Sequence, residues 1–171
     1  MIVLSKKLLT DLTCKADFSP RLRQSLNIHN NHQEPCQRLL NSINIGSYIQ
    51  PHRHSLDQRK ELLIAVRGKF ALVEFFDDGQ FKQFTVFSTE RYSQIDDSTF
   101  GVEIPPDVWH TVIALEVGSV LLEVKEGPFN SEIAKAAAIW APEPQSVGVS
   151  EYLLSLYSFC GFGSLLEGNR Y

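Results

Sequence analysis

Apolar and polar residues alternate in short blocks through the middle of the chain, from about residue 46 to residue 129. Apolar segments such as ELLIAVRG, KFALVEFF, FKQFTVF and GSVLLEVKEG recur about every 8 to 15 residues and are rich in β-branched and aromatic side chains. Short segments of this kind, separated by turn residues, predict an antiparallel β-sandwich or a small β-barrel. Within EFFDDGQFKQF, the dipeptide Asp78-Gly79 predicts a tight hairpin, because these residues accept the positive φ angles of such turns.

The segment before this β-rich region predicts one helix followed by irregular chain. The leucines of SKKLLTDLTCKAD are spaced as on one helix face, and Ser5 precedes them as an N-cap, so residues 5–17 predict a short amphipathic helix. Residues 18–36 are polar and rich in Asn, which predicts an irregular surface segment.

Helical composition returns after Pro128. The segments SEIAKAAAIW and SEYLLSLYSFC, separated by the breaker APEPQ, predict two short C-terminal helices, and GFGSLLEGNRY at the end predicts a loose tail. We therefore expect one domain over residues 1–171, with a helix and loop in 1–36, a β-rich core over about 37–129 and a helical extension in 130–171.

The composition is that of a globular protein, with 171 residues, 43% of them hydrophobic and 21% charged. A chain of this length buries a core without disulfides or a structural metal. The net charge of −4 offers no basic surface for a phosphate backbone, so we do not expect a nucleic-acid partner. The three cysteines are scattered, which predicts a reducing compartment, and no apolar run reaches the ~20 residues of a membrane span. We expect a cytoplasmic protein that does not bind a membrane.

Two histidines in SYIQPHRHSLDQ, His52 and His54, are the strongest candidates for chemistry. In an extended strand alternate residues point to the same face, so both imidazoles can meet one ion. Glu61 begins the next apolar segment and can fold back toward them, and His110 in GVEIPPDVWHTV can supply a third imidazole. Three imidazoles and one carboxylate suit Fe(II), Mn, Ni, Zn or Cu(II), with positions left for water or substrate. The ordinary alternatives are a solvent-facing histidine stripe, a solvated glutamate and a hydrogen-bonded core histidine.

Other polar residues are candidates for contact with a small-molecule ligand. His29 and His32 lie in a polar loop that can fold over a barrel opening, although solvated histidines are the commoner case. The planar fork of Arg38 matches a carboxylate or phosphate, with a surface ion pair as its ordinary role. Tyr48 lies in an apolar strand and must face either solvent or a pocket, because an unpaired buried polar group is costly. The same question arises for Glu103, Glu123 and Lys125.

The spacing G-x5-H-x-H followed by E-x6-G, from Gly46 to Gly68, resembles the first cupin motif, and GVEIPPDVWH resembles the second. More narrowly, QRLLN, PHRH, GVEIPP, WHT, EVKEGPF and WAP are similar to segments of the WbuC-like cupin-fold metalloproteins, which often occur with O-antigen gene clusters. The resemblance extends from about Ser19 to about Tyr157.

This resemblance implies a double-stranded β-helix barrel of the cupin or jelly-roll type, usually a homodimer, whose mouth holds one divalent metal ion through His52, His54, Glu61 and His110. The chain departs from the family pattern at three places. Six residues, Ser55 to Lys60, separate His54 from Glu61 where cupins usually have fewer, so Asp57 is an alternative ligand. Asp107 replaces the usual glycine of the second motif, and Ala114 stands where many cupins carry Asn.

We therefore expect a metal-dependent enzyme that acts on a small polar molecule, such as a sugar or sugar nucleotide in surface-polysaccharide metabolism. No residue is assigned a catalytic role. One alternative is a metal-independent epimerase or isomerase, in which His54 or His110 is the general base and Arg38 or Arg53 holds an anion. Another is a non-catalytic ligand-binding or structural cupin, because one fold hosts all three uses.

Overall fold

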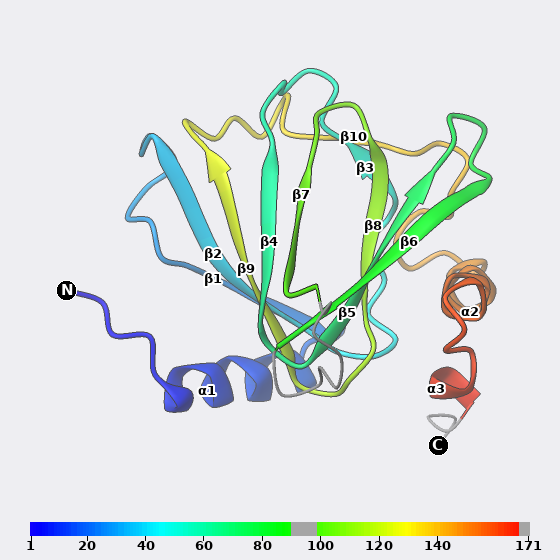
Figure 1. Ribbon diagram of the computed structural model, residues 1–171, viewed down its shortest axis with the longest axis horizontal. Helices are drawn as coiled ribbons and strands as arrows, with labels where there is room; N and C mark the ends of the chain where they lie inside the picture. Colours follow the sequence, from blue (N-terminus) through cyan, green and yellow to red (C-terminus); the bar gives the residue numbers. More distant parts are fainter. Residues whose placement is uncertain (90–98, 168–171) are drawn as a thin grey trace.

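The computed structural model describes residues 1–89 and 99–167 (Figure 1). In chain order, the elements of this part are α1 (Lys6–Asp17), β1 (Arg23–Asn27), β2 (Cys36–Ile43), β3 (His52–Arg53), β4 (Glu61–Arg67), β5 (Lys69–Phe75), β6 (Phe81–Ser88), β7 (Gly101–Ile104), β8 (Trp109–Ala114), β9 (Ser119–Glu126), β10 (Ala136–Ala137), α2 (Val149–Phe159) and α3 (Ser164–Glu167).

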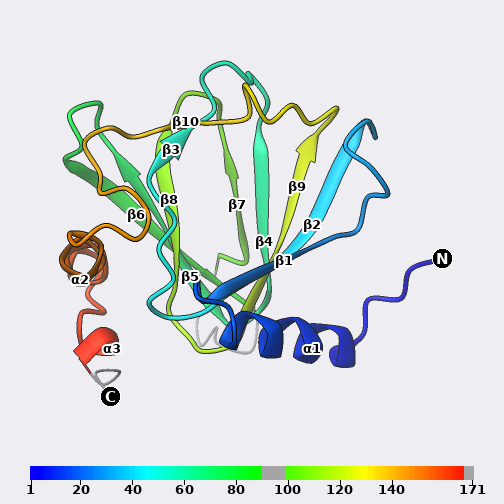
Figure 2. The same ribbon diagram turned by 180° about the vertical axis from the view of Figure 1, so that it is seen from behind.

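Two five-stranded antiparallel sheets face each other and form a barrel of the cupin or jelly-roll type (Figures 1 and 2). The strand order is β1-β2-β9-β4-β7 in one sheet and β10-β3-β8-β5-β6 in the other. Strands far apart in the sequence are therefore neighbours: β9 lies between β2 and β4, and β8 lies between β3 and β5. This crossed strand order confirms the predicted fold class.

An apolar core fills the space between the inner faces of the two sheets. Phe70 on β5 and Phe87 on β6 are fully buried and stack with their ring centroids 5.3 Å apart. Leu63, Leu121 and Val112 belong to the same core cluster. Burying side chains of this size stabilises the fold by about 1.5–3 kcal/mol each, so the barrel does not depend on a metal ion for its core.

Helix α1, which the sequence predicted, lies against the outside of the first sheet (Figure 1). Ser5 is its N-cap, and its hydroxyl oxygen accepts a hydrogen bond from the backbone N–H of Leu8 at 3.2 Å. Leu12 is buried and packs with Leu40 of β2 and Val120 of β9. The apolar stripe of the helix thus covers the outer face of these two strands.

The composition of residues 18–36 predicted an irregular segment, but part of it forms a strand. It contains β1, which pairs along its whole length with β2, from Arg23 opposite Ile43 to Asn27 opposite Leu39. Strand β1 is at the edge of its sheet, where polar side chains are tolerated and protect the unpaired edge. Its polar sequence therefore gave no apolar alternation from which a strand could be predicted.

The hairpin predicted around Asp78-Gly79 joins β5 and β6. Gly79 has φ +86°, whereas Asp78 is not among the described residues with positive φ, so the turn is not the two-residue type that the dipeptide suggested. The amide of Phe76 donates to the carbonyl of Gln80 at 2.9 Å, and the amide of Gly79 donates to the carbonyl of Phe76 at 3.0 Å. A Cβ at residue 79 would lie 2.7 Å from the Trp140 ring, which adds a steric reason for glycine.

The first predicted C-terminal helix, SEIAKAAAIW, does not form. Its alanines instead contribute β10, in which Ala136 is opposite Arg53 and Ala137 is opposite His52. The amide of Ala138 donates to the carbonyl of Pro51 at 2.8 Å, and Ala138 is fully buried. Pairing with the edge of the second sheet therefore outweighs the helix propensity of the alanines.

The second predicted C-terminal helix is confirmed as α2, which lies beside the second sheet (Figure 2). The predicted loose tail is wrong for residues 164–167, which form α3, and residues 168–171 lie outside the described part. Tyr157 of α2 is fully buried, and its hydroxyl donates to the carbonyl of Ala114 at 2.8 Å and accepts from the amide of Gly46 at 3.2 Å.

In the part of the chain that the structure describes, none of the helices combines the length and the apolar character needed to cross a membrane.

We predict that Tyr157→Phe lowers the free energy of unfolding by about 1–3 kcal/mol, because it leaves a buried carbonyl without its donor. Tyr152→Phe on the same helix is the matched control. The Tyr152 hydroxyl is buried without a hydrogen-bond partner among the described residues, so its removal should leave stability within about 0.5 kcal/mol of the wild type or raise it. Urea unfolding of the two variants measures the difference, and equal losses would contradict this account of α2 docking.

Candidate metal centre

Three histidines converge because the barrel places β3 directly beside β8. His52 on β3 is the register partner of His110 on β8, and their ring centroids are 4.6 Å apart. His54 follows β3 on the same face, with its ring centroid 5.3 Å from that of His52 and 5.5 Å from that of His110. One ring nitrogen of each histidine lies within 4.8 Å of the others, which is close enough for one ion to contact all three.

Backbone carbonyls orient each of these rings. Nδ1 of His52 lies 3.0 Å from the carbonyl oxygen of Gln50, and Nδ1 of His110 lies 2.8 Å from that of Val108. Nδ1 of His54 contacts the carbonyl oxygen of Ala134. A carbonyl oxygen only accepts, so these contacts assign the hydrogen of His52 and of His110 to Nδ1 and leave their Nε2 lone pairs for a cation. Nδ1 of His54 also lies 3.0 Å from Nζ of Lys125, which only donates, so this ring can carry its hydrogen on Nε2 or offer Nε2 to a cation. Such outer partners are typical of histidines that ligate metals.

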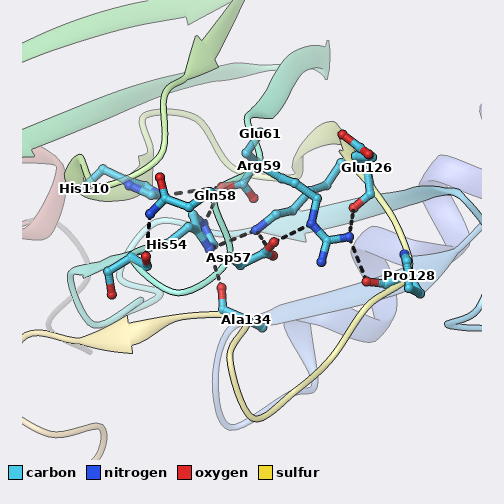
Figure 3. Close-up of polar contacts among 11 residues, drawn as sticks. His54, Asp57, Gln58, Arg59, Glu61, His110, Glu126, Pro128 and Ala134 are labelled. Carbon is cyan, nitrogen blue, oxygen red and sulfur yellow. Dashed lines mark hydrogen bonds and ion pairs between the residues drawn. The ribbon is translucent and has the colours of Figure 1, made fainter.

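Glu61 completes the cluster from the facing sheet, where it is the first residue of β4. Its Oε2 lies 3.0 Å from Nε2 of His54 and 3.6 Å from Nε2 of His110 (Figure 3). The carboxylate is buried, with 7% of the residue exposed. Two imidazole nitrogens and a buried carboxylate oxygen therefore point at one another, and either a proton or a cation can bridge them.

The long loop between His54 and Glu61 is held in place by a buried ionic network. Asp57 is buried and lies 2.9 Å from Nζ of Lys125, and it also pairs with Arg59 (Figure 3). Arg59 donates to the carbonyls of Glu126 at 3.0 Å and Pro128 at 2.8 Å. These contacts engage Asp57 with two cations, so Glu61 rather than Asp57 faces the imidazoles despite the extra residues.

The turn between β7 and β8 accommodates the departure from the second cupin motif. Asp107 has φ +64°, the left-handed conformation for which the usual glycine is suited. Aspartate tolerates this conformation better than most residues do, and its carboxylate accepts from the side chain of Gln58 at 3.3 Å. The replacement therefore preserves the turn that leads into His110.

Electrostatics favour an uncharged imidazole beside a charged carboxylate. Burial and the neighbouring charges of His110 and Lys135 lower the pKa of His52 to about 3, so this ring is neutral at pH 7. Burial alone would raise the pKa of Glu61, but hydrogen bonds and charges from His110 and His54 outweigh it and hold this pKa well below its ordinary value. Neutral imidazole and ionised carboxylate are the protonation states in which these groups bind metal ions.

A second, partly buried carboxyl group, that of Glu123, lies beside Glu61. Burial and the charge of Glu61 raise the pKa of Glu123 well above its ordinary value, and the amide of Asn41 donates to its Oε2 at 2.7 Å. Glu123 is on β9, two residues before Lys125, and both line the same cavity. The sequence did not show which way these side chains point. The strand register decides which of these side chains face the cavity. Glu103 on β7, by contrast, faces outward and pairs with Lys60 at 2.6 Å.

The histidines and both glutamates line a cavity of about 540 Å³. His29, a predicted ligand contact, also lines this cavity. Its Nδ1 lies 3.0 Å from both the backbone amide and the carbonyl oxygen of Arg38, and its Nε2 is a buried atom with no partner among the described residues. A cavity of this size suits a small molecule.

The structure places two other predicted ligand contacts away from this cavity. Arg38 points outward from β2, with 41% of its side chain exposed, and pairs with Glu34 at 2.6 Å. Tyr48 is buried against α2, where its hydroxyl donates to the carbonyl of Pro142 at 2.7 Å. Neither residue lines the cavity, so both predicted ligand contacts are corrected. The side chain of Arg38 points to the face of β2 away from the cavity, and that of Tyr48 packs in the apolar cluster that includes α2.

Comparisons with known proteins agree with the fold and do not assign a function. A family model described as a domain of unknown function (DUF6016) matches residues 4–87. No curated protein matches the chain. Among solved structures, TT1209 from Thermus thermophilus is 13% identical over 74% of this chain and 97% of its own, with a TM-score of 0.50.

Two further solved structures are similar at lower TM-scores. KdgF from Halomonas sp. is 16% identical, with 68% of this chain and 88% of that chain covered and a TM-score of 0.48. A cupin 2 domain-containing protein from Halorhodospira halophila is 15% identical, with 87% and 82% covered and a TM-score of 0.45. Identities this low concern the fold alone, so the narrower WbuC-like resemblance stays a prediction.

We predict that Glu123→Gln stabilises the metal-free protein at pH 7 by at least about 1 kcal/mol. Because the pKa of Glu123 is raised on folding, the folded wild type keeps a proton that the unfolded chain releases above about pH 4.5. Wild-type stability therefore falls relative to the variant as pH rises from 4.5 toward the raised pKa, by about 1.4 kcal/mol per pH unit at most.

Urea unfolding at several pH values, after removal of metal, measures this effect. Glu103→Gln is the control, since its carboxylate is exposed and pairs only at the surface. Wild-type and Glu123→Gln stabilities that run parallel between pH 4.5 and 7 would show that Glu123 is ionised in the folded protein.

Proposed function

We propose that the chain binds one divalent transition-metal ion through His52, His54, Glu61 and His110. The observation that carries this proposal is the convergence of three carbonyl-oriented imidazoles, two of which lie beside one buried carboxylate oxygen. The mixed nitrogen and oxygen donors suit Fe, Mn, Ni or Zn, and four protein ligands leave coordination positions free in a six-coordinate ion. The site lines a cavity, so those positions are accessible to a small molecule.

We further propose that the protein is an enzyme acting on a small polar molecule. A bound ion would supply Lewis-acid polarisation of a carbonyl or hydroxyl oxygen. The chain itself supplies a proton at Glu123, held in the wall of the same cavity, and an ionised carboxylate at Glu61. A sugar or sugar nucleotide in surface-polysaccharide metabolism is the ligand that the WbuC-like resemblance favours, and a cytoplasmic homodimer is the expected state.

A metal-independent acid–base enzyme is the second candidate, favoured by the 3.0 Å contact between His54 and Glu61, because a carboxylate can orient a histidine that acts as general base. Neither anion clamp predicted for this alternative supports it. Arg38 pairs with Glu34 outside the cavity. Arg53 lies over the Trp109 ring at 4.6 Å and pairs with Asp77 at 3.3 Å, also away from the cavity lining. A non-catalytic cupin remains the third candidate.

We predict that the double variant His52→Ala, His54→Ala loses stoichiometric metal binding and stays folded. Two of four ligands are removed, whereas the apolar core between the sheets is untouched. Metal analysis of untagged protein after incubation with Fe, Mn, Ni and Zn salts measures occupancy, and circular dichroism measures folding. His32→Ala, an exposed histidine of the same cavity, should bind metal like the wild type. Wild-type protein that takes up none of these metals would defeat the proposal.

We predict that Glu61→Gln lowers metal affinity, whereas Asp57→Asn lowers stability. Glu61→Gln removes the carboxylate ligand and should weaken metal affinity by at least about tenfold. Asp57→Asn leaves the buried Lys125 without its carboxylate and should lower stability by about 3–5 kcal/mol while keeping metal stoichiometry. Competition with a chromogenic chelator measures affinity, and thermal unfolding measures stability. Loss of metal in Asp57→Asn with normal binding in Glu61→Gln would identify Asp57 as the ligand.

A further inference from the structure

The cavity that contains the histidines has a second, basic side. Arg21, Arg23 and Lys135 line it. In the part of the chain that the structure describes, none of these three has a carboxylate oxygen within ion-pair distance. Lys125, which lines the same cavity, is by contrast neutralised by Asp57 at 2.9 Å. Among the described residues, the cations on the basic side of the cavity therefore have no carboxylate in direct contact with them.

Arg23 is held in a fixed position. It is partly buried at the start of β1, where its Nη1 donates to the carbonyl of Tyr48 at 2.6 Å and lies 3.4 Å from the Ser47 hydroxyl. Both of these partners are neutral acceptors, so the positive charge is anchored and not cancelled. A guanidinium has five N–H donors, and those of Arg23 that Tyr48 and Ser47 do not engage can meet an oxyanion side by side.

Lys135 approaches from the opposite edge of the barrel. It precedes β10, and β1 and β10 are the edge strands of the two facing sheets (Figure 2). Lys135 is an exposed residue at the rim of the cavity, and the protein around its ammonium group together with the positive charge of Arg23 lowers its pKa, while Glu123 and Glu61 act in the other direction. Lys135 therefore lies within electrostatic reach of both Arg23 and the glutamates beside the histidines.

Two cations brought together without an anion repel one another, and an anionic ligand group between them would relieve that repulsion. We propose that Arg23 and Lys135 bind the oxyanion group, a carboxylate or a phosphate, of a small ligand whose other end reaches the histidine cluster. This inference refines the proposed function by naming the ligand class, yet the anion site itself does not require the metal. A cavity of about 540 Å³ restricts the ligand to the size of a metabolite.

Other side chains of the cavity suit a polar ligand between these two ends. Ser25 and Asn27 alternate with Arg23 along β1 and line the same cavity, as does Asn41 on the neighbouring strand. Hydroxyl and amide groups at these positions can hydrogen-bond a hydroxylated ligand body. The sequence predicted Arg38 as the residue that holds an anion. In this proposal Arg23, at the start of β1, and Lys135, just before β10, have that role instead.

The test is an NMR titration of the full chain, freed of metal and then exchanged into buffer without chelator, because chelators are themselves carboxylates. Inorganic phosphate and acetate are the two probes, used separately. We expect at least one to bind saturably with shifts centred on β1 and residues 134–136. Arg23→Gln and Lys135→Gln should each weaken that binding by at least about tenfold. Preference for one probe identifies the oxyanion.

Lys82→Gln is the matched control, since it changes net charge equally but lies on β6 beside Glu74 at 3.6 Å. It should bind the probe like the wild type. Arg23 also supports the Tyr48 carbonyl, so Lys135→Gln, on an exposed residue, keeps the test valid if Arg23→Gln unfolds. Binding of neither probe by the wild type, or affinities in Lys135→Gln equal to those in Lys82→Gln, would overturn the proposal.

Metal uptake is measured on the same variants, so that the two proposals can fail separately. Arg23→Gln and Lys135→Gln should retain wild-type metal stoichiometry, because neither residue is among the proposed ligands. Anion binding without metal uptake by the wild type would defeat the proposed metal centre alone. Metal uptake without anion binding would defeat the anion site alone.

Discussion

The buried carboxylate of Glu61 is the constraint around which the site is organised. An ionised carboxyl group removed from water is costly unless positive charge or hydrogen-bond donors compensate it. Here the compensation comes from a proton or a cation between the carboxylate oxygen and Nε2 of His54 and His110, which lie 3.0 Å and 3.6 Å from it. The barrel has to bring β3, β8 and β4 together for this to occur, so the arrangement of both sheets and the charge state of one side chain are coupled.

Charge is distributed unevenly through the cavity, and each part has a physical reason. Hydrogen bonds and charges from His110 and His54 hold the pKa of Glu61 well below its ordinary value, whereas burial and the adjacent charge of Glu61 raise the pKa of Glu123 well above its ordinary value. Lys125 is neutralised by Asp57, which also fixes the loop preceding Glu61. Such an arrangement places two carboxyl groups with oppositely shifted pKa values in a single wall, which is a common basis for proton transfer.

The same strands carry both the core and the site. On β4, Glu61 and Leu63 face inward, and on β9, Leu121 and Glu123 do the same, so that each strand is apolar toward one end of the barrel and polar toward the other. Stability comes from the apolar end, where Phe70 and Phe87 stack. This division allows polar residues of the cavity to be exchanged without dismantling the core, which is how one fold hosts many chemistries.

The sequence by itself predicted a β-sandwich or small barrel, α1, the hairpin between β5 and β6, and α2, because strand alternation, capping residues and turn residues act over a few neighbouring positions. The resemblance to cupins grouped His52, His54, Glu61 and His110 as candidate metal ligands. Only the tertiary structure decided that Ala136 and Ala137 form a strand, that Tyr48 faces α2, and that Arg23 and Lys135 share a cavity with the histidines. Each of these depends on which strands become neighbours when the sheets cross over. Pairing between residues about 80 positions apart leaves no local pattern, since its free energy comes from contacts that exist only after the barrel has closed.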